Sequence, residues 1–372
     1  MMSGNRNMEC TEMKTRITDL FGIRYPIILP GMSWISVPDL VAAVSNAGGL
    51  GVLATGPLTT DETRTSIQKI RKQTDKPFGA GVTLLMPGAR ENAEVVIAEK
   101  VPVVIFSLGR DKNLFQRIHD YGGKIVCTVT TARHAHAAIE AGADALSVIG
   151  YEAAGHGSAV STLVLTPSIV DEVKVPVIAG GGIGDGRGLM AALALGADAV
   201  YMGTRLSMTK ESPVHGHSKN LTLQHGMEDT LYSDRFDGLY CRVLKTPQAE
   251  KAIRRGMSFP RAFLASLKIS QKLKMPWIKV FIGSMVKGGP GLLMKLAHFV
   301  IAVEAIEKMT VGGDTQKGVQ LTGQVQGIIH DVPTVSALIE RIVKEADAIC
   351  RTMPEKVFLS PGAGSGTPPD RL

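Results

Sequence analysis

The sequence has few cysteines and no long hydrophobic run. Its four cysteines lie far apart and form no CxxC pair, which argues against a zinc knuckle and a disulfide framework, so we expect reduced thiols. No uninterrupted apolar run reaches the ~18 residues that span a bilayer. The first fourteen residues contain no apolar core followed by a small-residue cleavage site. No secretory signal is therefore readable, and we expect a cytoplasmic protein.

The sequence does contain enough apolar residues for a large folded core. Hydrophobic residues make up 44% of the 372 residues and charged residues 20%, a composition too apolar for a disordered chain. At ~150 residues per domain the length suggests two to three domains, although an α/β barrel often holds ~250 residues in one core. Glycine is frequent, with 41 residues, and clusters where strands are expected to end. This clustering indicates backbone that approaches a ligand closely.

Positive charge is concentrated in one segment. Residues 242–295 contain twelve lysines and arginines and one acidic residue, a net charge of +11, whereas the whole chain carries +7. Aromatic and aliphatic side chains are interleaved with these cations, so we expect an anionic partner with an apolar part rather than nucleic acid. A membrane-surface or partner-binding element, a substrate lid and a solvated basic face remain alternatives for this segment.

Eight short apolar runs recur along the first part of the chain, each followed by a stretch of small, polar or helix-periodic residues. The runs are 26–32, 50–55, 78–85, 103–108, 124–129, 145–150, 176–182 and 199–204. Strands buried on both faces read as continuous apolar runs, and their alternation with helices indicates parallel pairing with right-handed crossovers. The count of eight predicts an α/β protein with a closed TIM (β/α)8 barrel, and an open doubly wound sheet is the alternative.

This alternation stops after residue 204, and the remaining sequence predicts a second unit. We expect a disordered N-terminal tail over 1–14, the barrel over 15–231, a basic, largely helical substrate or lid subdomain over 232–350 and a flexible C-terminal tail over 351–372. Glycine, proline and serine are enriched in the last of these. The predicted architecture is therefore a barrel with an additional, mostly helical C-terminal subdomain.

The strongest local motif is AGGGIGDGRG, residues 179–188, between an expected strand and an alanine-rich helix. Such glycines let backbone amides close on an anion, and the helix start near Asp185 would aim its dipole at the same point. Gly203 and Thr204 end the eighth run, and barrel enzymes commonly build one phosphate site from their last two loops. The motif therefore predicts a phosphate site. Residues 186–191 also match the dinucleotide pattern G-x-G-x-x-A, but they do not lie in the first βα unit, where that pattern belongs.

A second motif, GYEAAGHGS at residues 150–158, follows the sixth run. Barrel enzymes carry their catalytic groups at this end of the strands, and glycines on both sides of His156 give its ring room to project into the barrel mouth. His156 is therefore the candidate catalytic residue. Glu152 either orients His156 or faces solvent. The HxH pairs at 134–136 and 215–217 have no nearby residues to complete a coordination shell, so we expect no metal ion.

Seven motifs follow one another along the chain: LPGMSW, NAGGLGVLA, KPFGAGVTLL, GYEAAGHGS, PVIAGGGIGDGRG, ALALGADAVYMGTRL and GVQLTGQVQGIIHD. In this order they resemble the nitronate monooxygenase (2-nitropropane dioxygenase) family, which is related to FMN-dependent enoyl-thioester reductases. The resemblance covers residues 15–212 and 310–342. It implies a TIM barrel that holds FMN.

The resemblance also implies where the cofactor binds. The FMN phosphate would lie at the glycines after the seventh run and at Gly203 and Thr204, the isoalloxazine ring over Gly31 and Met32, and His156 beside the reactive face of the ring. The expected cofactor contacts are Gly31, Met32, Gly81, Thr128, Ala154, Gly155, Gly180, Gly181, Gly182, Gly203 and Thr204.

Two of these positions depart from the family pattern. Gly81 stands where many members have an asparagine near the flavin, and Thr128 stands where some nitronate- and quinone-active members have a lysine. The basic segment 242–295 is also longer than simple members need. The two departures limit what can be carried over from the family, and the length of the basic segment argues against a small nitronate substrate.

The resemblance predicts an FMN-dependent oxidoreductase that oxidises alkyl nitronates with O2. The alternative is an NAD(P)H-dependent reductase of enoyl- or acyl-CoA, or carrier-protein, thioesters, in which the basic segment would pair with CoA phosphates. An alternative of another class is membrane-surface or partner binding through 242–295. We expect a small-molecule substrate, no nucleic acid and no membrane, and we leave a homo-oligomer open.

Overall fold

A barrel of parallel strands forms the larger part of the computed structural model, which describes residues 13–86, 88–255, 298 and 301–357. Eight strands close the barrel in chain order, and β1 is hydrogen-bonded to both β2 and β8. They are β1 (Ile27–Leu29), β2 (Leu50–Ala54), β3 (Phe78–Thr83), β4 (Val103–Ser107), β5 (Lys124–Val129), β6 (Ala145–Ile149), β7 (Val177–Gly180) and β8 (Ala199–Tyr201). Each lies within one predicted run. The TIM barrel is therefore confirmed, and the open sheet is wrong.

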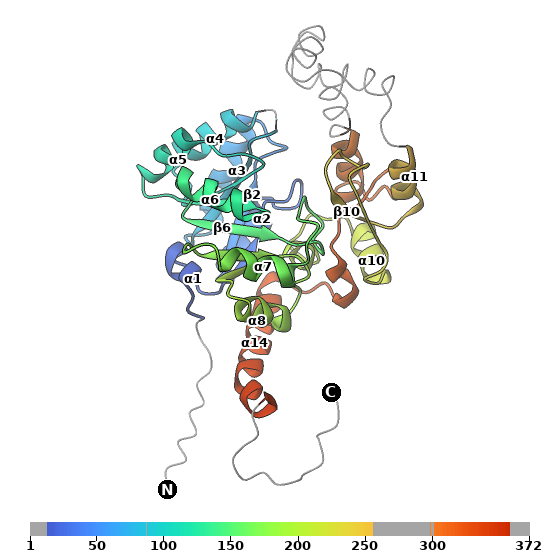
Figure 1. Cartoon of the computed structure of the whole chain (residues 1–372). Coiled ribbons are helices and arrows are strands. Elements are labelled where there is room, and N and C mark those ends of the chain that lie inside the picture. Colours follow the sequence, from blue (N-terminus) through green and yellow to red (C-terminus); the bar gives the residue numbers. More distant parts are fainter. Residues whose placement is uncertain (1–12, 87, 256–297, 299–300, 358–372) are drawn as a thin grey trace, which may run out of the picture.

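Helices follow the strands and surround the barrel (Figure 1). They are α2 (Pro38–Asn46), α3 (Thr60–Gln73), α4 (Ala89–Ala98), α5 (Lys112–His119), α6 (Ala132–Ala141), α7 (Thr162–Val170), α8 (Gly186–Ala194) and the short α9 (Gly203–Ser207). Local sequence sets several of their ends. Thr59 and Glu62 form a capping box at the start of α3, and Gly142, with φ 107°, ends α6 in the left-handed conformation.

The barrel interior changes character along its axis. At the amino ends of the strands the interior is filled by apolar side chains. Ile17 and Phe21 of α1 (Arg16–Phe21), the helix that precedes β1, close this end. Toward the carboxyl ends of the strands the interior is polar, because hydroxyl side chains replace apolar ones. They are hydrogen-bonded in pairs at 2.9 Å: Thr128 with Ser147, and Thr83 with Ser107. The apolar floor and polar top identify the carboxyl end as the one that can receive a polar ligand.

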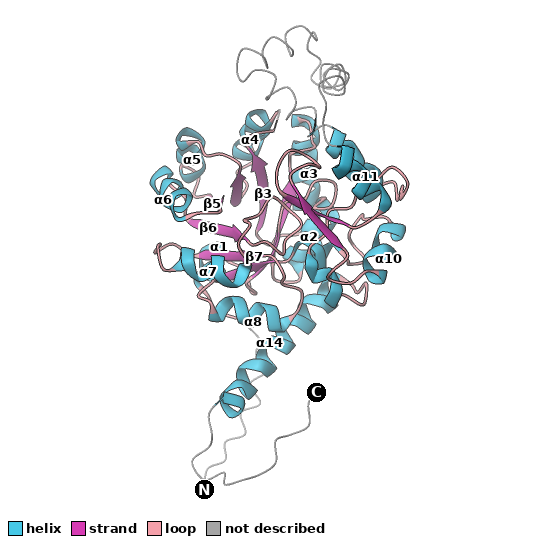
Figure 2. Cartoon of the chain, turned by 45° about the vertical axis from the view of Figure 1, so that its right-hand side comes forward, coloured by secondary structure: helices cyan, strands magenta, loops and turns pink. Residues whose placement is uncertain are grey.

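A smaller lobe stands beside the barrel mouth (Figure 2). It contains α10 (Gly216–Gln224), the antiparallel hairpin of β9 (Thr230–Ser233) and β10 (Cys241–Leu244), α11 (Pro247–Arg255) and helical residues 301–310. Its core joins Phe236 and Val243 of the hairpin segment to Ile306, and Trp34 of the β1 loop packs against it. The hairpin is a difference from the sequence prediction, which expected a largely helical unit over 232–350.

The C-terminal helix α14 (Val335–Val357) belongs to the wall of the barrel. It packs against α8 and α2, and Figures 1 and 2 both show it running beside α8. The 3-10 helix η1 (Gln324–Ile328) precedes it in the chain. The predicted domain boundaries at 231 and 350 stay predictions. The expected terminal tails fall largely on 1–12 and 358–372, outside the described residues.

Within the part of the chain that the structure describes, no helix is both long and apolar enough to cross a membrane.

Candidate active site

Loops from the first, third and eighth strands meet at the carboxyl end of the barrel. A Cβ on Gly31 would lie 3.5 Å from the Cα of Gly81, and a Cβ on Gly203 would lie 3.3 Å from the Sδ of Met32. Four of the predicted contact residues therefore lie side by side, and three of them lack a side chain. Their backbone forms a surface that a planar ligand can approach closely.

The turn after β7 requires glycine. Gly181 and Gly182 have φ values of 112° and 75°, and a Cβ on Gly181 would lie 2.6 Å from the Thr162 hydroxyl oxygen. Among the described residues, neither amide of this glycine pair donates to a backbone or side-chain acceptor. Two orphan N–H groups held in this way can bind an anion.

Thr204 stands in the neighbouring loop. Its hydroxyl oxygen accepts a hydrogen bond from the Gly323 amide at 3.0 Å, which leaves the hydroxyl proton available to a ligand. Residue Met202, which precedes α9, provides no side-chain cap for the first turn of that helix. The loops after β7 and β8 thus both carry polar hydrogens suited to a phosphate.

The start of α8 does not contribute to this anion site, contrary to the sequence prediction. The Asp185 carboxylate accepts from the Gly188 amide at 3.1 Å, and the Glu345 carboxylate of α14 accepts from the Gly186 amide at 2.8 Å. Two carboxylates at one helix N-terminus are stabilised by its dipole and repel a further anion. The predicted dipole contribution is therefore wrong for α8.

His156 lies in the loop after β6 and is paired with the lobe. Its Nε2 is 2.7 Å from the Oδ2 of Asp237, whose side chain is only 3% exposed, whereas the imidazole is 29% exposed. The other Asp237 oxygen accepts from the Leu239 amide at 3.0 Å. The buried carboxylate therefore fixes the imidazole through a charge-assisted hydrogen bond. Sequence reasoning missed Asp237, because no local pattern links it to His156, which lies 81 residues away in the chain.

Glu152 has a structural role that neither sequence alternative described. Its carboxylate accepts from the Thr162 amide at 2.9 Å and from the Thr162 hydroxyl at 2.8 Å, at the start of α7. Its carbonyl oxygen accepts from the Gln324 amide at 2.9 Å. Glu152 thus holds the loop after β6 against both α7 and η1, and it does not bind His156.

The remaining predicted contacts lie around these loops at different depths. Gly180 ends β7, and a Cβ on Gly155 would meet no atom within 4 Å. The Ala154 carbonyl accepts from the Arg242 amide at 3.0 Å, which ties the loop after β6 to β10. Thr128 lies inside the barrel, where it pairs with Ser147, one layer below the glycine turn.

Buried thiols add no nucleophile to the site. Burial raises the pKa of Cys127 to about 12, and burial together with the charge of Asp237 raises the pKa of Cys241 well above its ordinary value. Both thiols therefore stay protonated at neutral pH, and the imidazole of His156 stays the candidate reactive group of the barrel mouth.

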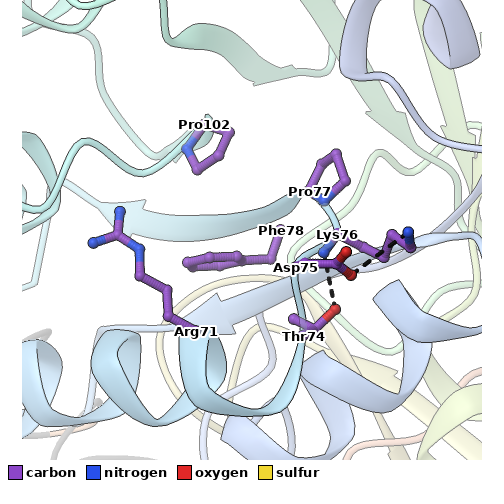
Figure 3. Close-up of a pocket in the computed structure, with 7 residues that line it drawn as sticks. All are labelled: Arg71, Thr74, Asp75, Lys76, Pro77, Phe78 and Pro102. Atoms are coloured by element: carbon purple, nitrogen blue, oxygen red, sulfur yellow. Dashed lines mark hydrogen bonds and ion pairs between the residues drawn. The ribbon is translucent and has the colours of Figure 1, made fainter.

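A separate pocket lies at the other end of the barrel (Figure 3). It is formed by residues at the end of α3 and before β3 and β4, including Arg71, Phe78 and Pro102. The Lys76 and Asp75 side chains that border it pair with each other at 3.5 Å. This pocket is remote from the loops that carry His156 and the glycines.

Comparison with known proteins places the chain in a family. The family model described as "Nitronate monooxygenase" matches residues 14–95 and 88–345. A Mycobacterium tuberculosis protein named "(3aS,4S,5R,7aS)-5-hydroxy-7a-methyl-1-oxo-octahydro-1H-indene-4-carboxyl-CoA dehydrogenase" is 38% identical over 348 residues, 90% of this chain and 96% of the relative. A "Probable nitronate monooxygenase" of Staphylococcus aureus is 31% identical over 62% of this chain and 78% of its own.

Solved structures agree with this assignment. FabK from Thermotoga maritima has a TM-score of 0.78 and 34% identity, over 93% of this chain and all of that one. The nitroalkane oxidase of Streptomyces ansochromogenes has a TM-score of 0.73 and 26% identity, over 91% and 99%. The resemblance predicted from the motifs is therefore confirmed: the chain belongs to the nitronate monooxygenase family of flavin-dependent oxidoreductases.

Proposed function

We propose that the protein is an FMN-dependent oxidoreductase that uses NAD(P)H and acts on the acyl part of a CoA thioester. The relatives named as CoA dehydrogenases are similar over 90–91% of this chain, a coverage that cannot be reached without residues of the lobe. The Staphylococcus relatives cover 62%. The observation that carries the proposal is the His156–Asp237 pair, because it joins the barrel and the lobe in one site.

The glycine loops fit FMN. Gly181, Gly182, Gly203 and Thr204 would hold the phosphate, because they offer unpaired amides, a free hydroxyl proton and no side chain large enough to fill the space. The ring would lie near Gly31 and Met32, with the other predicted contacts around it. When bound, FMN supplies the hydride transfer between the nicotinamide and the substrate.

His156 would act on the thioester carbonyl. Its Nε2 proton is donated to the Asp237 carboxylate, and its Nδ1 has no hydrogen-bond partner among the described residues. With a second proton on Nδ1, the ring would donate from Nδ1 to the carbonyl oxygen, where negative charge develops in the transition state. A group placed in this way contributes about 10²- to 10⁴-fold to the rate.

Oxidation of alkyl nitronates with O2 is the second candidate. The family model, the Staphylococcus relatives and the nitroalkane oxidase structure favour it. The same protonated imidazole would then hold the nitro oxygens of a substrate that is already an anion.

One anaerobic experiment separates the two candidates. The purified protein is analysed for bound FMN, reduced with NADH or NADPH, and mixed with a saturated or an α,β-unsaturated alicyclic acyl-CoA, or with propyl nitronate. We expect the unsaturated thioester to reoxidise the flavin without oxygen, and the saturated thioester to reduce the oxidised flavin in the reverse direction. The proposal would be refuted if neither thioester reacted and propyl nitronate was turned over in a parallel assay with oxygen.

A further inference from the structure

Three side chains of the loop that joins β9 to β10 lie in different surroundings. Ser233 and Cys241 form the last pair of the ladder, so residues 234–240 connect the two strands. Phe236 points into the core of the lobe, and Asp237 contacts His156. Tyr240, in contrast, is 54% exposed. A large aromatic side chain therefore lies on the surface, three residues from the partner of the candidate catalytic histidine.

Tyr240 is held in place by a stack of aromatic rings. Its ring lies nearly parallel to that of Tyr232, with centroids 5.2 Å apart and an interplanar angle of 19°, and Tyr232 packs against Tyr151 at 4.6 Å. The guanidinium of Arg242 lies over the Tyr151 and Tyr232 rings at 4.4 and 5.2 Å. Because Tyr151 belongs to the loop that carries His156, the stack reaches from the catalytic loop to the protein surface.

The inner end of this stack is rigid. Arg242 is 2% exposed, and its guanidinium donates to the Tyr151 carbonyl at 2.8 Å and to the Thr230 hydroxyl at 2.9 Å. A ring supported in this way loses little conformational freedom when a second flat group stacks on it. Tyr240 is therefore a preorganised platform for a planar ring.

Exposed cations lie in the same loop as Tyr240 and on α11. Arg235, in the same loop, donates to the Arg254 carbonyl at 3.3 Å, which places its guanidinium at the C-terminal end of α11. Arg235, Lys251 and Arg255 are exposed and form no ion pair with another described residue, whereas Arg254 pairs with Glu250 at 3.4 Å. With all three acidic residues counted, Asp234, Asp237 and Glu250, the loop and α11 together carry a net charge of +1. An aromatic platform beside unpaired cations suits a base joined to phosphates.

We propose that Tyr240 stacks on the adenine of CoA and that Arg235 and the exposed cations of α11 bind its phosphates. The pantetheine arm would then lead from the lobe to His156. This inference rests on the proposed function, because it assigns the nucleotide end of the same thioester. Stacking of a base on an aromatic side chain corresponds to an affinity difference of about 10- to 100-fold.

The test compares Tyr240→Ala with Tyr240→Phe, which keeps the ring, and with Leu163→Ala, an exposed apolar side chain on α7. Calorimetry measures binding of adenosine 3′,5′-bisphosphate to the flavin-loaded protein. Turnover is measured with a CoA thioester and with the pantetheine thioester of the same acyl group. We expect Tyr240→Ala to weaken nucleotide binding and raise KM for the CoA thioester by about 10- to 100-fold, leaving the pantetheine thioester unaffected. The two other variants should resemble the wild type.

Two outcomes would overturn the inference. An equal rise in KM for both thioesters would show that Tyr240 acts on the acyl site. If Tyr240→Ala weakened only the binding of NADPH and left binding of the bisphosphate unchanged, the platform would be assigned to the nicotinamide cofactor. Failure of the proposed function is distinguishable, because the wild type would then use neither thioester, whereas bisphosphate binding would still report directly on Tyr240.

Discussion

The barrel and the lobe contribute different kinds of groups to the same site. The barrel offers mainly backbone, through glycines and orphan amides, and it does so from a scaffold filled with apolar side chains. The lobe has a small core and offers side chains: the buried Asp237, the buried Arg242 and the stacked tyrosines. Backbone amides suit a phosphate, whereas buried and stacked side chains can distinguish one substrate from another. We therefore expect cofactor binding to depend on the barrel and substrate choice on the lobe.

The largest effect tests whether chemistry and cofactor binding separate. His156→Gln should lower turnover about 10²- to 10⁴-fold, because it removes the group that can hold a proton at the substrate. The flavin content, measured by absorbance, should equal that of the wild type. His134→Gln, an exposed histidine on α6, is the control. A colourless His156→Gln protein would break the division between the two regions.

A glycine substitution tests the barrel side of the comparison. Gly181→Ala should lower flavin affinity by about 100-fold or more, because it disturbs two amides that each contribute a hydrogen bond to a charged group. Gly122→Ala is the matched control, since its φ of 85° is also positive but its Cβ would meet nothing within 4 Å. Flavin release followed by fluorescence measures the difference. Equal flavin loss in both variants would show that backbone strain alone is responsible.

Removing the buried cation tests how firmly the lobe is attached. Arg242→Met should lower the free energy of unfolding by about 1–3 kcal/mol, because the Tyr151 carbonyl and the Thr230 hydroxyl lose their donor. Urea unfolding measures this effect. The control variant Arg254→Met, at an exposed arginine, should change the free energy of unfolding little. If the flavin content of Arg242→Met fell together with its stability, the lobe would also support the cofactor site.

The smallest expected effect concerns pH and the attachment of α14. Side-chain hydrogen bonds from Arg341, together with the charge of Arg205, lower the pKa of Asp331. A lowered carboxylate pKa stabilises the folded state above the ordinary carboxylate range, and this stability is lost as the pH falls through the folded-state value. Between about pH 5 and about pH 3 the Tm of the wild type should therefore fall by a few degrees more than that of Asp331→Asn. Parallel pH profiles would contradict this.

The barrel could be predicted from the sequence because each of its strands is indicated by residues that are neighbours in the chain. Strands covered on both faces need apolar runs, and each of the eight runs contains one strand. Local motifs also identified His156 and the glycine turn as candidate site residues. The hairpin was missed because its two strands are short and are joined by the seven residues 234–240, so no two-residue turn motif indicates it.

Long-range partners could not be read from local patterns. Asp237 lies 81 residues from His156, and Glu345 lies 159 residues from the Gly186 amide that it caps. A periodic pattern predicts that α8 forms, but it does not reveal which side chain occupies the start of that helix. The error over the helix dipole arose there, since the residue that blocks the anion belongs to the last helix.

The order of synthesis gives these late partners a consequence. When the eighth strand has left the ribosome, the nascent chain holds the whole cylinder of strands, but it lacks the hairpin that positions His156, the Gly323 amide that binds Thr204 and the carboxylate that caps α8. The rim of the cylinder is thus completed by segments that follow β8 in the chain. We therefore expect FMN, the proposed cofactor, to bind only after these later segments have docked.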